Sequence, residues 1–535
     1  MKVSRMPAML AGLVALGCAS HGTPAPAPQP ASSPASQMAT SAAAPSPIAV
    51  LRTNIDSMIA DSMFRNANWG ILIVDPDRGD TLYSHNAGKL FMPASNMKVI
   101  TGSVALAQLG PDFRFRTAFV ADGPVCNGTV HGNLLVDGRG DPSESNAMRG
   151  DALAPMRDIA DSLRARGIDR VMGQVLAGTD AFPGPTLGYG WSWDDLDASY
   201  SAGVDELYFN EGAARVVIHG GRKPGAAVSV TVLPTSRYPK VRVEAVTESP
   251  PESLAVAGSG GRRRFSRMDG ELHTVLDTLS GTVVLTGWIA PDAVDSMDIV
   301  YPNEDTAFLE ALQGALAERG VALRGVTSRR KLGTCGAPAA RNTAPVLDTL
   351  FTYQSPPLRD VLRAMAKPSQ NQIAEILLRT LGLERGESGT ADSGIAVVRR
   401  QLLSWNVQPD GFVQRDGSGL SRYDYLTPET LVRVLATIRK DTAFSAFYDA
   451  LPIAGVDGTI GNRMRGTPAQ GNVHAKTGFV ANARSLSGYV TTADGHMLIF
   501  STLCNNWTTS VREIERVQDA IAVDLASLRM AGGTP

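Results

Sequence analysis

The sequence predicts an α+β fold, in which helices cover one antiparallel sheet built from the first and last strands of the chain. Apolar residues recur at helical spacing near both ends of the chain, next to short runs with strand character. The middle of the chain, residues 113–344, is instead rich in Gly, Val, Thr and Pro and has many short strand-like runs. A chain of 535 residues exceeds one ordinary hydrophobic core. The middle region is therefore predicted to form large, mostly β inserted domains, two of them nested.

The first residues predict export to the periplasm. Lys2 and Arg5 precede a short apolar run, so residues 1–18 have the layout of a signal peptide and not of a membrane span. The run ends in Ala15-Leu16-Gly17-Cys18, which is similar to the lipobox of bacterial lipoproteins, although Ala15 stands where leucine is usual. A lipid anchor on Cys18 and ordinary signal cleavage are both left open.

Residues 19–47 are almost wholly Pro, Ala, Ser, Gly, Gln and Thr, which predicts a flexible tether without a core. The terminal regions 48–112 and 345–530 then form one domain. Its predicted elements are a helix over Ile48–Phe64, strands over Trp69–Val74 and Thr81–Ser84, a helix from Pro93 to Gln108, helical segments from Leu358 onward, a hairpin of Ser485–Thr492 with Met497–Leu503, and a final helix over Val511–Met530.

Composition excludes several function classes. The formal net charge is −2, so the sequence predicts no nucleic-acid partner and no attraction to an acidic membrane surface. The remaining cysteines (Cys126, Cys335 and Cys504) form neither a disulfide framework nor a zinc pattern, and the pairing of any single bridge is left open. With seven scattered histidines and no HExxH motif, we expect no metal site and no cofactor.

The first motif with chemical meaning is Ser95-Asn96-Met97-Lys98, an SxxK sequence at the start of a helix. Residues three apart lie on the same helix face, so the amine of Lys98 can reach the hydroxyl of Ser95. A lysine that is kept neutral by burial and nearby positive charge can act as the base for a serine nucleophile. The motif is weak alone, because Ser328-Arg329-Arg330-Lys331 has the same spacing in an arginine-rich loop.

Two further motifs follow in the chain. Ser369-Gln370-Asn371 precedes a helix, where the hydroxyl can relay a proton and the amide can hold a peptide group, although Ser369 can equally be a helix N-cap. Lys476-Thr477-Gly478 stands before the final hairpin, where an edge strand can present a cation and a hydroxyl to a carboxylate. Gly478 allows a close backbone approach, although an ordinary turn explains the motif as well.

The three motifs occur in the order found in penicillin-binding proteins and serine β-lactamases, so the chain resembles that superfamily. The large separation between Ser95 and Ser369 resembles one family within it, the D-alanyl-D-alanine carboxypeptidase/endopeptidases, or low-molecular-mass class C penicillin-binding proteins. That resemblance implies a serine β-lactamase/DD-peptidase-like domain with inserted domains, and it covers roughly residues 48–528. Further stretches that look like the family are Gly138–Pro142, Gly190–Leu196, Asp416–Arg422 and Leu451–Met464.

The resemblance implies a role for each motif residue. Ser95 attacks the penultimate D-alanine carbonyl and forms an acyl-enzyme, while Lys98 accepts its proton. Ser369 relays a proton to the leaving amine and Asn371 positions the acyl side. Lys476 and Thr477 bind the terminal carboxylate, beside Gly478. The backbone N–H groups of Ser95 and Phe479 form the oxyanion hole.

Asp195 and Tyr200 match positions that in family members contact the free amino end of a diaminopimelate side chain. A carboxylate suits that ammonium group, although Asp195 can also be a structural residue beside a packed Trp193. The implied partners are peptidoglycan stem peptides and β-lactam antibiotics, with a membrane reached only through a lipid on Cys18. Two alternatives remain: a β-lactamase or esterase, and a non-catalytic lipoprotein that binds the cell wall.

Overall fold

The computed structural model describes residues 45–235, 237–249, 255–256, 264–265, 270–277, 280–324 and 347–530. The predicted signal peptide with Cys18, most of the tether, and Cys335 lie outside the described residues. The described chain from Ser46 onward forms one compact unit. Its first helix begins at Pro47, with Ser46 as N-cap, so helical structure starts within the last residues assigned to the tether.

Five antiparallel strands form the central sheet, in the order β2-β1-β24-β23-β22. The first and last strands of the chain thus pair as predicted, because β1 runs antiparallel to β24, and β22 lies at an edge. The strands are β1 (Asn68–Asp75), β2 (Asp80–His85), β22 (His474–Val480), β23 (Ala483–Thr491) and β24 (Met497–Asn505).

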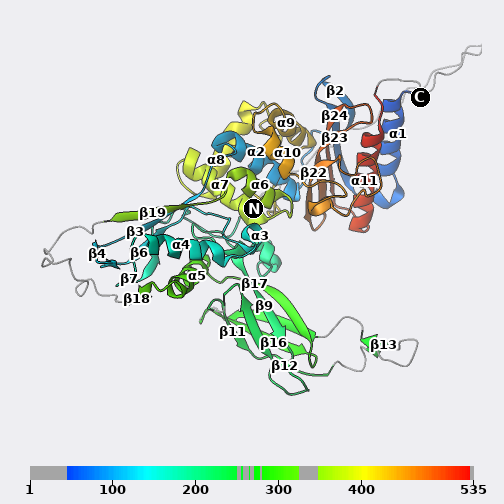
Figure 1. Ribbon diagram of the computed structural model, residues 1–535. Helices are drawn as coiled ribbons and strands as arrows, with labels where there is room; N and C mark the ends of the chain where they lie inside the picture. Colours follow the sequence, from blue (N-terminus) through cyan, green and yellow to red (C-terminus); the bar gives the residue numbers. More distant parts are fainter. Residues whose placement is uncertain are drawn as a thin grey trace, which may run out of the picture. The chain divides into compact units, whose positions relative to one another are not determined.

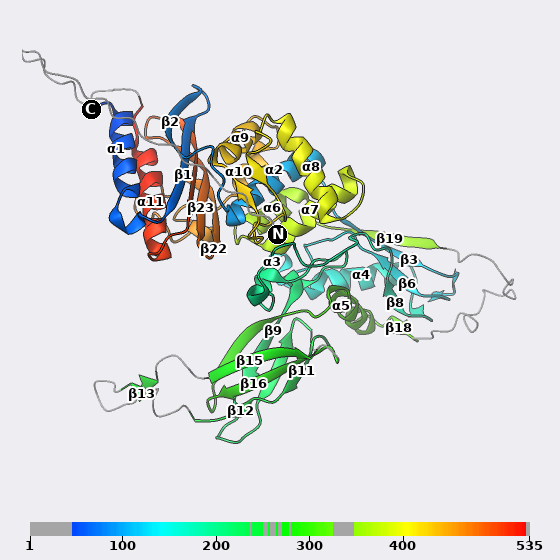
Figure 2. The ribbon, with the colours of Figure 1, turned by 180° about the vertical axis from the view of Figure 1, so that it is seen from behind.

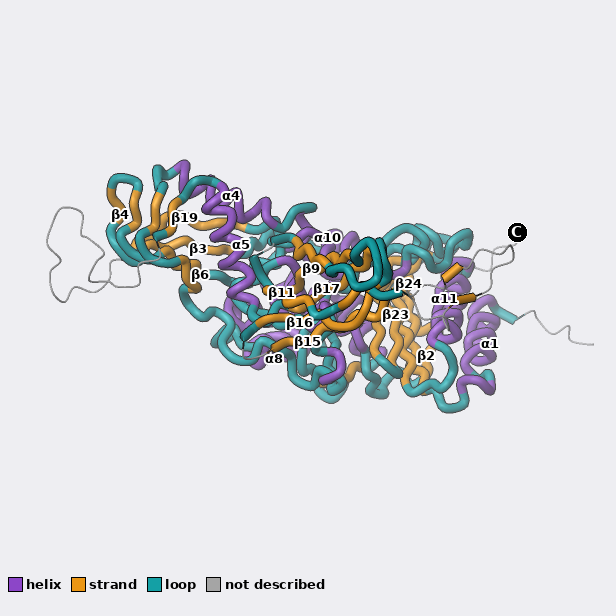
Figure 3. The backbone as a smooth tube through the Cα atoms, turned by 90° about the horizontal axis from the view of Figure 1, so that it is seen from below, coloured by secondary structure: helices purple, strands orange, loops and turns teal. Residues whose placement is uncertain are grey.

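Helices cover both faces of this sheet, and Figures 1 and 2 show one pair on one side and a larger group on the other. Ile71 and Ile73 pack with the helix pair, whereas Leu72 packs with the larger group. This alternation follows from the two-residue period of a strand. The pair is α1 (Pro47–Ile59) and α11 (Val511–Ser527), which lie side by side in Figures 1 and 3.

The larger group of helices surrounds α2, whose residues from Met97 to Leu106 are all buried. A helix that is covered on every side is expected to be apolar all round, so the buried Lys98 within it requires a special environment. The group consists of α2 (Met97–Leu109), α6 (Leu358–Ala366), α7 (Asn371–Arg385), α8 (Ala391–Ser404), α9 (Pro428–Ile438) and α10 (Phe444–Ala450), with the short strands β20 (Phe412–Val413) and β21 (Tyr425–Leu426).

The inserted region has its own hydrophobic core, separate from the two cores on the sheet. It contains more helix than predicted, since α4 (Leu153–Ala165) and α5 (Glu304–Glu318) pack together within this core. Its first part has two four-stranded sheets, with orders β18-β7-β5-β4 and β19-β3-β6-β8. The members are β3 (Arg116–Ala121), β4 (Val125–Cys126), β5 (Thr129–Val130), β6 (Leu134–Asp137), α3 (Asn146–Arg149), β7 (Arg170–Val171), β8 (Val175–Ala177), β18 (Ala322–Leu323) and β19 (Asp348–Gln354).

A second group of strands is nested within the first part, between β8 and β18. It forms one sheet of order β10-β9-β17 and another in which β11, β12 and β15 all pair with β16. The strands are β9 (Ala213–His219), β10 (Ser229–Leu233), β11 (Lys240–Val243), β12 (Val246–Thr247), β13 (Ala255–Val256), β14 (Arg264–Phe265), β15 (Gly270–Asp277), β16 (Thr282–Ile289) and β17 (Val294–Val300).

The C-terminal limit of the inserted region differs from the predicted one. The prediction assigned residue 345 onward to the first domain, but β19 pairs with β3 and Phe351 belongs to the core of the inserted region. Strand pairing brings residues close that are distant in sequence, so this limit was not readable from composition. Cys126 is disulfide-bonded and Cys504 is a buried free thiol. Among the described helices, none is long and apolar enough to cross a bilayer.

Candidate active site

Ser95 and Lys98 meet at the start of α2, as the SxxK spacing predicted. Ser95 lies in the short 3-10 helix η2 (Ala94–Asn96), which runs directly into α2. The Nζ atom of Lys98 lies 2.9 Å from Ser95 Oγ. Ala94 has a φ of 47°, a left-handed backbone that costs a non-glycine residue energy and that is found in clusters at active sites. The serine is thus placed by a tight, strained turn and faces its neighbouring amine.

The amine of Lys98 is buried and held from three sides. Its residue is 1% exposed, and Nζ donates to Asn371 Oδ1 at 2.6 Å and to the Ser418 carbonyl at 2.9 Å, besides its contact with Ser95. Burial lowers the pKa of Lys98 to about 7, although the nearby carboxylates of Asp416 and Glu375 act in the opposite direction. A substantial fraction of this lysine is therefore neutral near pH 7 and able to accept a proton.

A second buried lysine contacts the second motif. Lys476 Nζ donates to Ser369 Oγ at 2.8 Å and to the Thr477 carbonyl at 2.8 Å. Burial, together with the positive charges of Lys98 and Arg484, lowers the pKa of Lys476 well below its ordinary value. Ser369 has a φ of 69°, so it is a second left-handed residue at the site. None of the groups that shift the pKa of Lys476 is acidic, so a carboxylate bound here would be attracted to this amine.

Asn371 connects Lys98 to the inserted region. Its Oδ1 accepts from Lys98, and its Nδ2 donates to the carbonyl of Tyr200 at 2.7 Å. Both polar atoms of the amide are thus engaged within the protein. The residue thereby ties Lys98 to the segment that carries Tyr200.

The third motif lies on the edge strand β22, close to η2. Asn96 joins the two elements, because its Nδ2 donates to the Lys476 carbonyl at 3.0 Å and to Ser485 Oγ at 2.7 Å. A Cβ atom on Gly478 would lie 2.2 Å from Ser485 Oγ, 2.5 Å from the Pro93 carbonyl and 3.0 Å from the backbone nitrogen of Ser95. Only glycine lets the strand lie this close to the serine.

Two carboxylates bind the backbone of the loop that contains Ser418, whose carbonyl accepts a hydrogen bond from Lys98. Asp416 accepts from the backbone nitrogens of Gly419 and Ser421, each at 2.7 Å, and Glu375 accepts from that of Ser418 at 2.8 Å. Gly419 has a φ of 83°, and a Cβ there would lie 1.8 Å from the Ala94 carbonyl. The loop therefore fits directly against the turn that carries Ser95.

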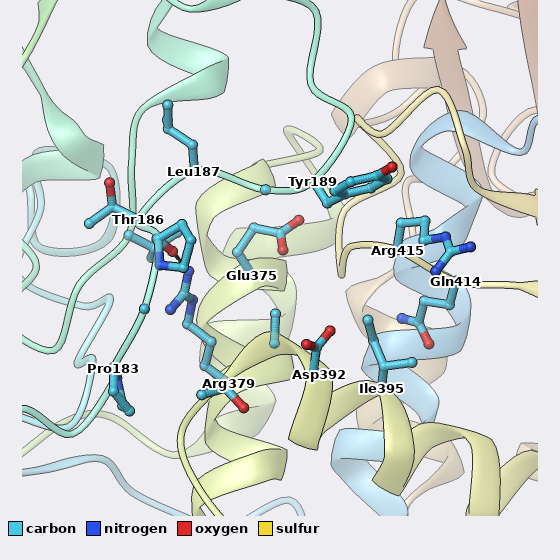
Figure 4. Close-up of a pocket in the computed structure, with 16 residues that line it drawn as sticks. Pro183, Thr186, Leu187, Tyr189, Glu375, Arg379, Asp392, Ile395, Gln414 and Arg415 are labelled. Carbon is cyan, nitrogen blue, oxygen red and sulfur yellow. Dashed lines mark hydrogen bonds between the residues drawn. The ribbon is translucent and has the colours of Figure 1, made fainter.

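A cavity of about 410 Å³ lies on the far side of Glu375, shown in Figure 4. Glu375 and Arg379 project from α7 toward the loop that contains Thr186 and Tyr189. Burial and the charge of Asp416 raise the pKa of Glu375 to about 7. Glu375 thus lies between this cavity and the loop that contains Ser418.

Residues of all three motifs line a cleft of about 650 Å³. Most of the predicted site residues contribute to its lining, whereas the two lysines lie beneath it and are 1% exposed. Its lining residues are Ser95, Asp194, Asp195, Tyr200, Ser369, Asn371, Gly419, Leu420, Arg422, Thr459, Thr477, Phe479, Val480, Ala481 and Arg484.

Asp195 and Tyr200 stand together at one wall of this cleft. The Tyr200 hydroxyl donates to Asp195 Oδ1, which raises the pKa of Tyr200 to about 12. The interpretation that Asp195 lies beside a packed Trp193 is wrong, because the Trp193 side chain is 86% exposed. Trp193 belongs to a short 3-10 helix on the surface, so it gives Asp195 no apolar support.

Sequence reasoning missed several residues that complete the site. They include the bridging Asn96 and Ser485, the carboxylates Glu375 and Asp416, and Thr459, whose hydroxyl bonds to that of Thr477 at 2.7 Å. Asn96 was visible within the SxxK motif, and Asp416 and Thr459 belong to stretches that carried the family resemblance. Nothing in the sequence indicated that Glu375 or Ser485 reach the site, since each acts across a tertiary contact.

The site combines a serine with a buried lysine of lowered pKa, beneath a cleft and on a helix that packs against an antiparallel sheet. This combination defines the class of serine acyl-transferases that use lysine as base. Residues 51–528 match the model of the D-Ala-D-Ala carboxypeptidase 3 (S13) family, and the chain belongs to this family. It is therefore a hydrolase, a serine-type D-alanyl-D-alanine peptidase of the penicillin-binding kind, as the motifs predicted.

Known relatives align with most of this chain. A D-alanyl-D-alanine carboxypeptidase of Actinomadura sp. (strain R39) is 34% identical over 485 residues, which cover 89% of this chain and 84% of the relative. DacB of Haemophilus influenzae is 25% identical over 460 residues, covering 85% and 88%. The crystal structure of penicillin-binding protein 4 from Haemophilus influenzae has a TM-score of 0.71 at 23% identity, with 89% of this chain and 99% of that one covered, which confirms the fold.

Proposed function

We propose that this enzyme cleaves D-alanyl peptide bonds of peptidoglycan through an acyl-enzyme on Ser95, with Lys98 as the base. The observation that supports this assignment is the 2.9 Å contact between Ser95 Oγ and the buried Lys98 Nζ, whose pKa is about 7. The neutral amine takes the serine proton as Oγ attacks the carbonyl of the penultimate D-alanine. The C–N bond then breaks, and water later hydrolyses the ester and frees Ser95.

Ser369 and Lys476 serve the leaving group in this proposal. Their 2.8 Å contact forms a path along which a proton reaches the departing amine. The terminal carboxylate of the substrate binds near Lys476 and the hydroxyl of Thr477, which lines the cleft. A negative charge there favours the protonated form of Lys476 and so reverses the effect of burial on its pKa.

The backbone N–H groups of Ser95 and Phe479 form the oxyanion hole. The close approach of β22 to η2 at Gly478 supports this assignment, because it brings the two backbone segments together. Donors held in this way stabilise the negative charge that develops on the carbonyl oxygen.

Gly478→Ala is expected to lower the rate of acylation by on the order of 10²–10³-fold. The added Cβ would meet Ser485 Oγ and the Pro93 carbonyl, so the strand must move away from Ser95 and the oxyanion donors separate. Stopped-flow acylation by a chromogenic β-lactam measures the change. The matched control is Gly88→Ala, because a Cβ at Gly88 meets nothing closer than 3.7 Å. Equal rates in the two variants would contradict the oxyanion assignment.

We propose that Asp195 and Tyr200 recognise the free amino end of the stem-peptide side chain. Both line the cleft, and the Tyr200 hydroxyl orients the Asp195 carboxylate. Asp195→Asn is expected to raise KM about 10-fold to 100-fold for a peptide with an ammonium side chain, as expected for a lost charged hydrogen bond. A peptide that carries an acetylated side chain should be cleaved alike by both forms. Equal KM changes for the two peptides would disprove the assignment.

The proposed function is tested by D-alanine release from a stem peptide that ends in D-Ala-D-Ala, with and without benzylpenicillin. Release that stops when one equivalent of penicillin is bound supports a slowly deacylating peptidase. Rapid consumption of penicillin without a lasting adduct would favour a β-lactamase. Intact penicillin with no adduct and no D-alanine release would favour a non-catalytic wall-binding protein.

We also propose that the enzyme acts outside the cytoplasm, at the peptidoglycan. The charged and apolar residues before Cys18 support export, and residues 19–47 would serve as a tether if Cys18 carries a lipid. A mature chain that begins with a lipid-modified Cys18, detected by mass spectrometry of the N-terminal peptide, is the expected result. A mature N-terminus beyond Cys18 would exclude the anchor.

A further inference from the structure

Three carboxylates outside the catalytic cleft converge on one another. Asp180, Asp205 and Glu206 each offer an oxygen, and these oxygens all lie within 4.8 Å of one another. Asp180 follows the end of β8, whereas Asp205 and Glu206 follow the short helix that carries Tyr200. Asp180 is exposed and Asp205 is half-buried, so the cluster is open to solvent on one side.

The buried member of the cluster has one carboxyl oxygen without a hydrogen-bond partner. Glu206 is 5% exposed, and its Oε2 atom is fully covered and has no hydrogen-bond partner. A carboxylate in this position is costly unless a cation or a proton compensates it. Asp305, at the start of α5, likewise has a covered Oδ1 without a hydrogen-bond partner, and its largest charge interaction is with Asp205. Acidic side chains from two separate elements therefore converge here.

Positive charge near the cluster comes from Arg379, which is already engaged. Its guanidinium donates to the carbonyls of Pro185 and Phe182. The side chain projects from α7 into the cavity shown in Figure 4, toward the loop that contains Thr186. Its interactions with Asp205, Asp180 and Glu206 are long-range charge interactions. One arginine thus faces four carboxyl groups, when Asp305 is counted.

We propose that Asp180, Asp205 and Glu206 bind a calcium ion, with Asp305 adding negative charge behind it. Ca²⁺ takes six to eight oxygen ligands at about 2.3–2.6 Å, so oxygens on opposite sides of one ion lie about 5 Å apart. Three oxygens within 4.8 Å of one another thus fit around a single ion. The open side leaves room for water ligands, and Ca²⁺ accepts a flexible coordination geometry, whereas Mg²⁺ requires a near-ideal octahedron.

The ion would fix the two ends of one segment, residues 180–206, that forms a wall of the catalytic cleft. This segment carries Asp195 and Tyr200, and its carbonyls at Ser199 and Ala202 accept from Gln372 at 3.0 and 3.2 Å. At its far end, the Glu206 carbonyl accepts from the Gly140 nitrogen at 2.8 Å. Calcium would therefore act as a structural ligand that holds the substrate-binding wall to the rest of the inserted region.

The test is calorimetric titration of chelator-treated enzyme with CaCl₂ and, separately, with MgCl₂, followed by thermal unfolding. We expect one saturable Ca²⁺ site per chain and a rise in Tm on adding Ca²⁺. Asp205→Asn and Glu206→Gln should each weaken binding by about tenfold or more and abolish the rise in Tm. Asp161→Asn is the matched control, because it removes the same charge from an exposed carboxylate that pairs with Arg319; this variant should bind Ca²⁺ like the wild type.

Three results would overturn the proposal. The first is no saturable Ca²⁺ binding to the wild type, and the second is unchanged affinity in both cluster variants. The third is tighter binding of Mg²⁺ than of Ca²⁺, which would refute the choice of ion. If the variants raise Tm without Ca²⁺ while the wild type shows no response to the ion, the carboxylates repel one another and no metal is bound. Because the readout is binding and not catalysis, the outcome is independent of the proposed reaction.

Discussion

Ser95→Ala is expected to abolish the covalent adduct with benzylpenicillin and to lower D-alanine release by on the order of 10⁴-fold or more. The hydroxyl at 2.9 Å from Lys98 Nζ is the atom that would form the ester, and alanine offers no substitute. Intact-mass spectrometry after exposure to the antibiotic should show one adduct on the wild type and none on the variant. Proteolysis of the labelled wild type should place the added mass on the peptide that contains Ser95.

Ser103→Ala is the matched control for this experiment. Ser103 is buried on the same helix, and its Oγ has no hydrogen-bond partner, so the loss of its hydroxyl should leave both acylation and folding almost unchanged. An adduct that persists on Ser95→Ala, or that disappears equally from Ser103→Ala, would show that Ser95 is not the acylated residue. Thermal unfolding of both variants separates a chemical defect from loss of structure.

Lys98→Met is expected to lower the acylation rate by about 10²–10⁴-fold, the usual contribution of a positioned general base. Methionine keeps the length of the side chain but cannot take a proton. The pH profile gives a second readout. The base must be neutral, so acylation of the wild type should rise as pH increases through about 7, the pKa of Lys98, and then level off. Acylation rates measured by stopped flow across pH 5–9 should lack this rise in the variant.

The neighbouring carboxylate provides the alternative explanation for such a rise. The pKa of Glu375 is also about 7, and its side chain binds the backbone of Gly417 and Ser418, next to the carbonyl that contacts Lys98. A rise near pH 7 that survives in Lys98→Met but disappears in Glu375→Gln would assign the titration to the carboxylate. Lys89→Met, which replaces an exposed lysine, controls for the loss of a positive charge.

Several features of the site were predictable because they depend on local spacing. Residues three apart in a helix share a face, so the SxxK motif alone places Lys98 beside Ser95. The final hairpin was predicted from its turn residues, and Lys476 lies on the edge strand β22, which pairs with the first strand of that hairpin. The order of the motifs indicated the superfamily, and the separation between Ser95 and Ser369 indicated the family, which the match over residues 51–528 confirms.

Other features depend on contacts between distant segments. Asn96 was read only as the second position of a motif, yet its amide joins η2 to β22 and β23. The limit of the inserted region was wrongly placed because β19 pairs with β3 across more than two hundred residues. Trp193 was assumed to be packed because tryptophan is usually well covered, but no neighbouring element covers it here.

By itself the sequence determined the α+β fold class, the three motifs and the family, since hydrophobic period and short-range spacing are encoded within a few residues of one another. The tertiary structure alone decided how basic the catalytic lysine is. The pKa of Lys98 depends on its complete removal from water and on carboxylates at Glu375, Asp416 and Asp424, which stand hundreds of positions away in the chain. Desolvation and Coulomb interactions act through space, so only the folded chain sets them.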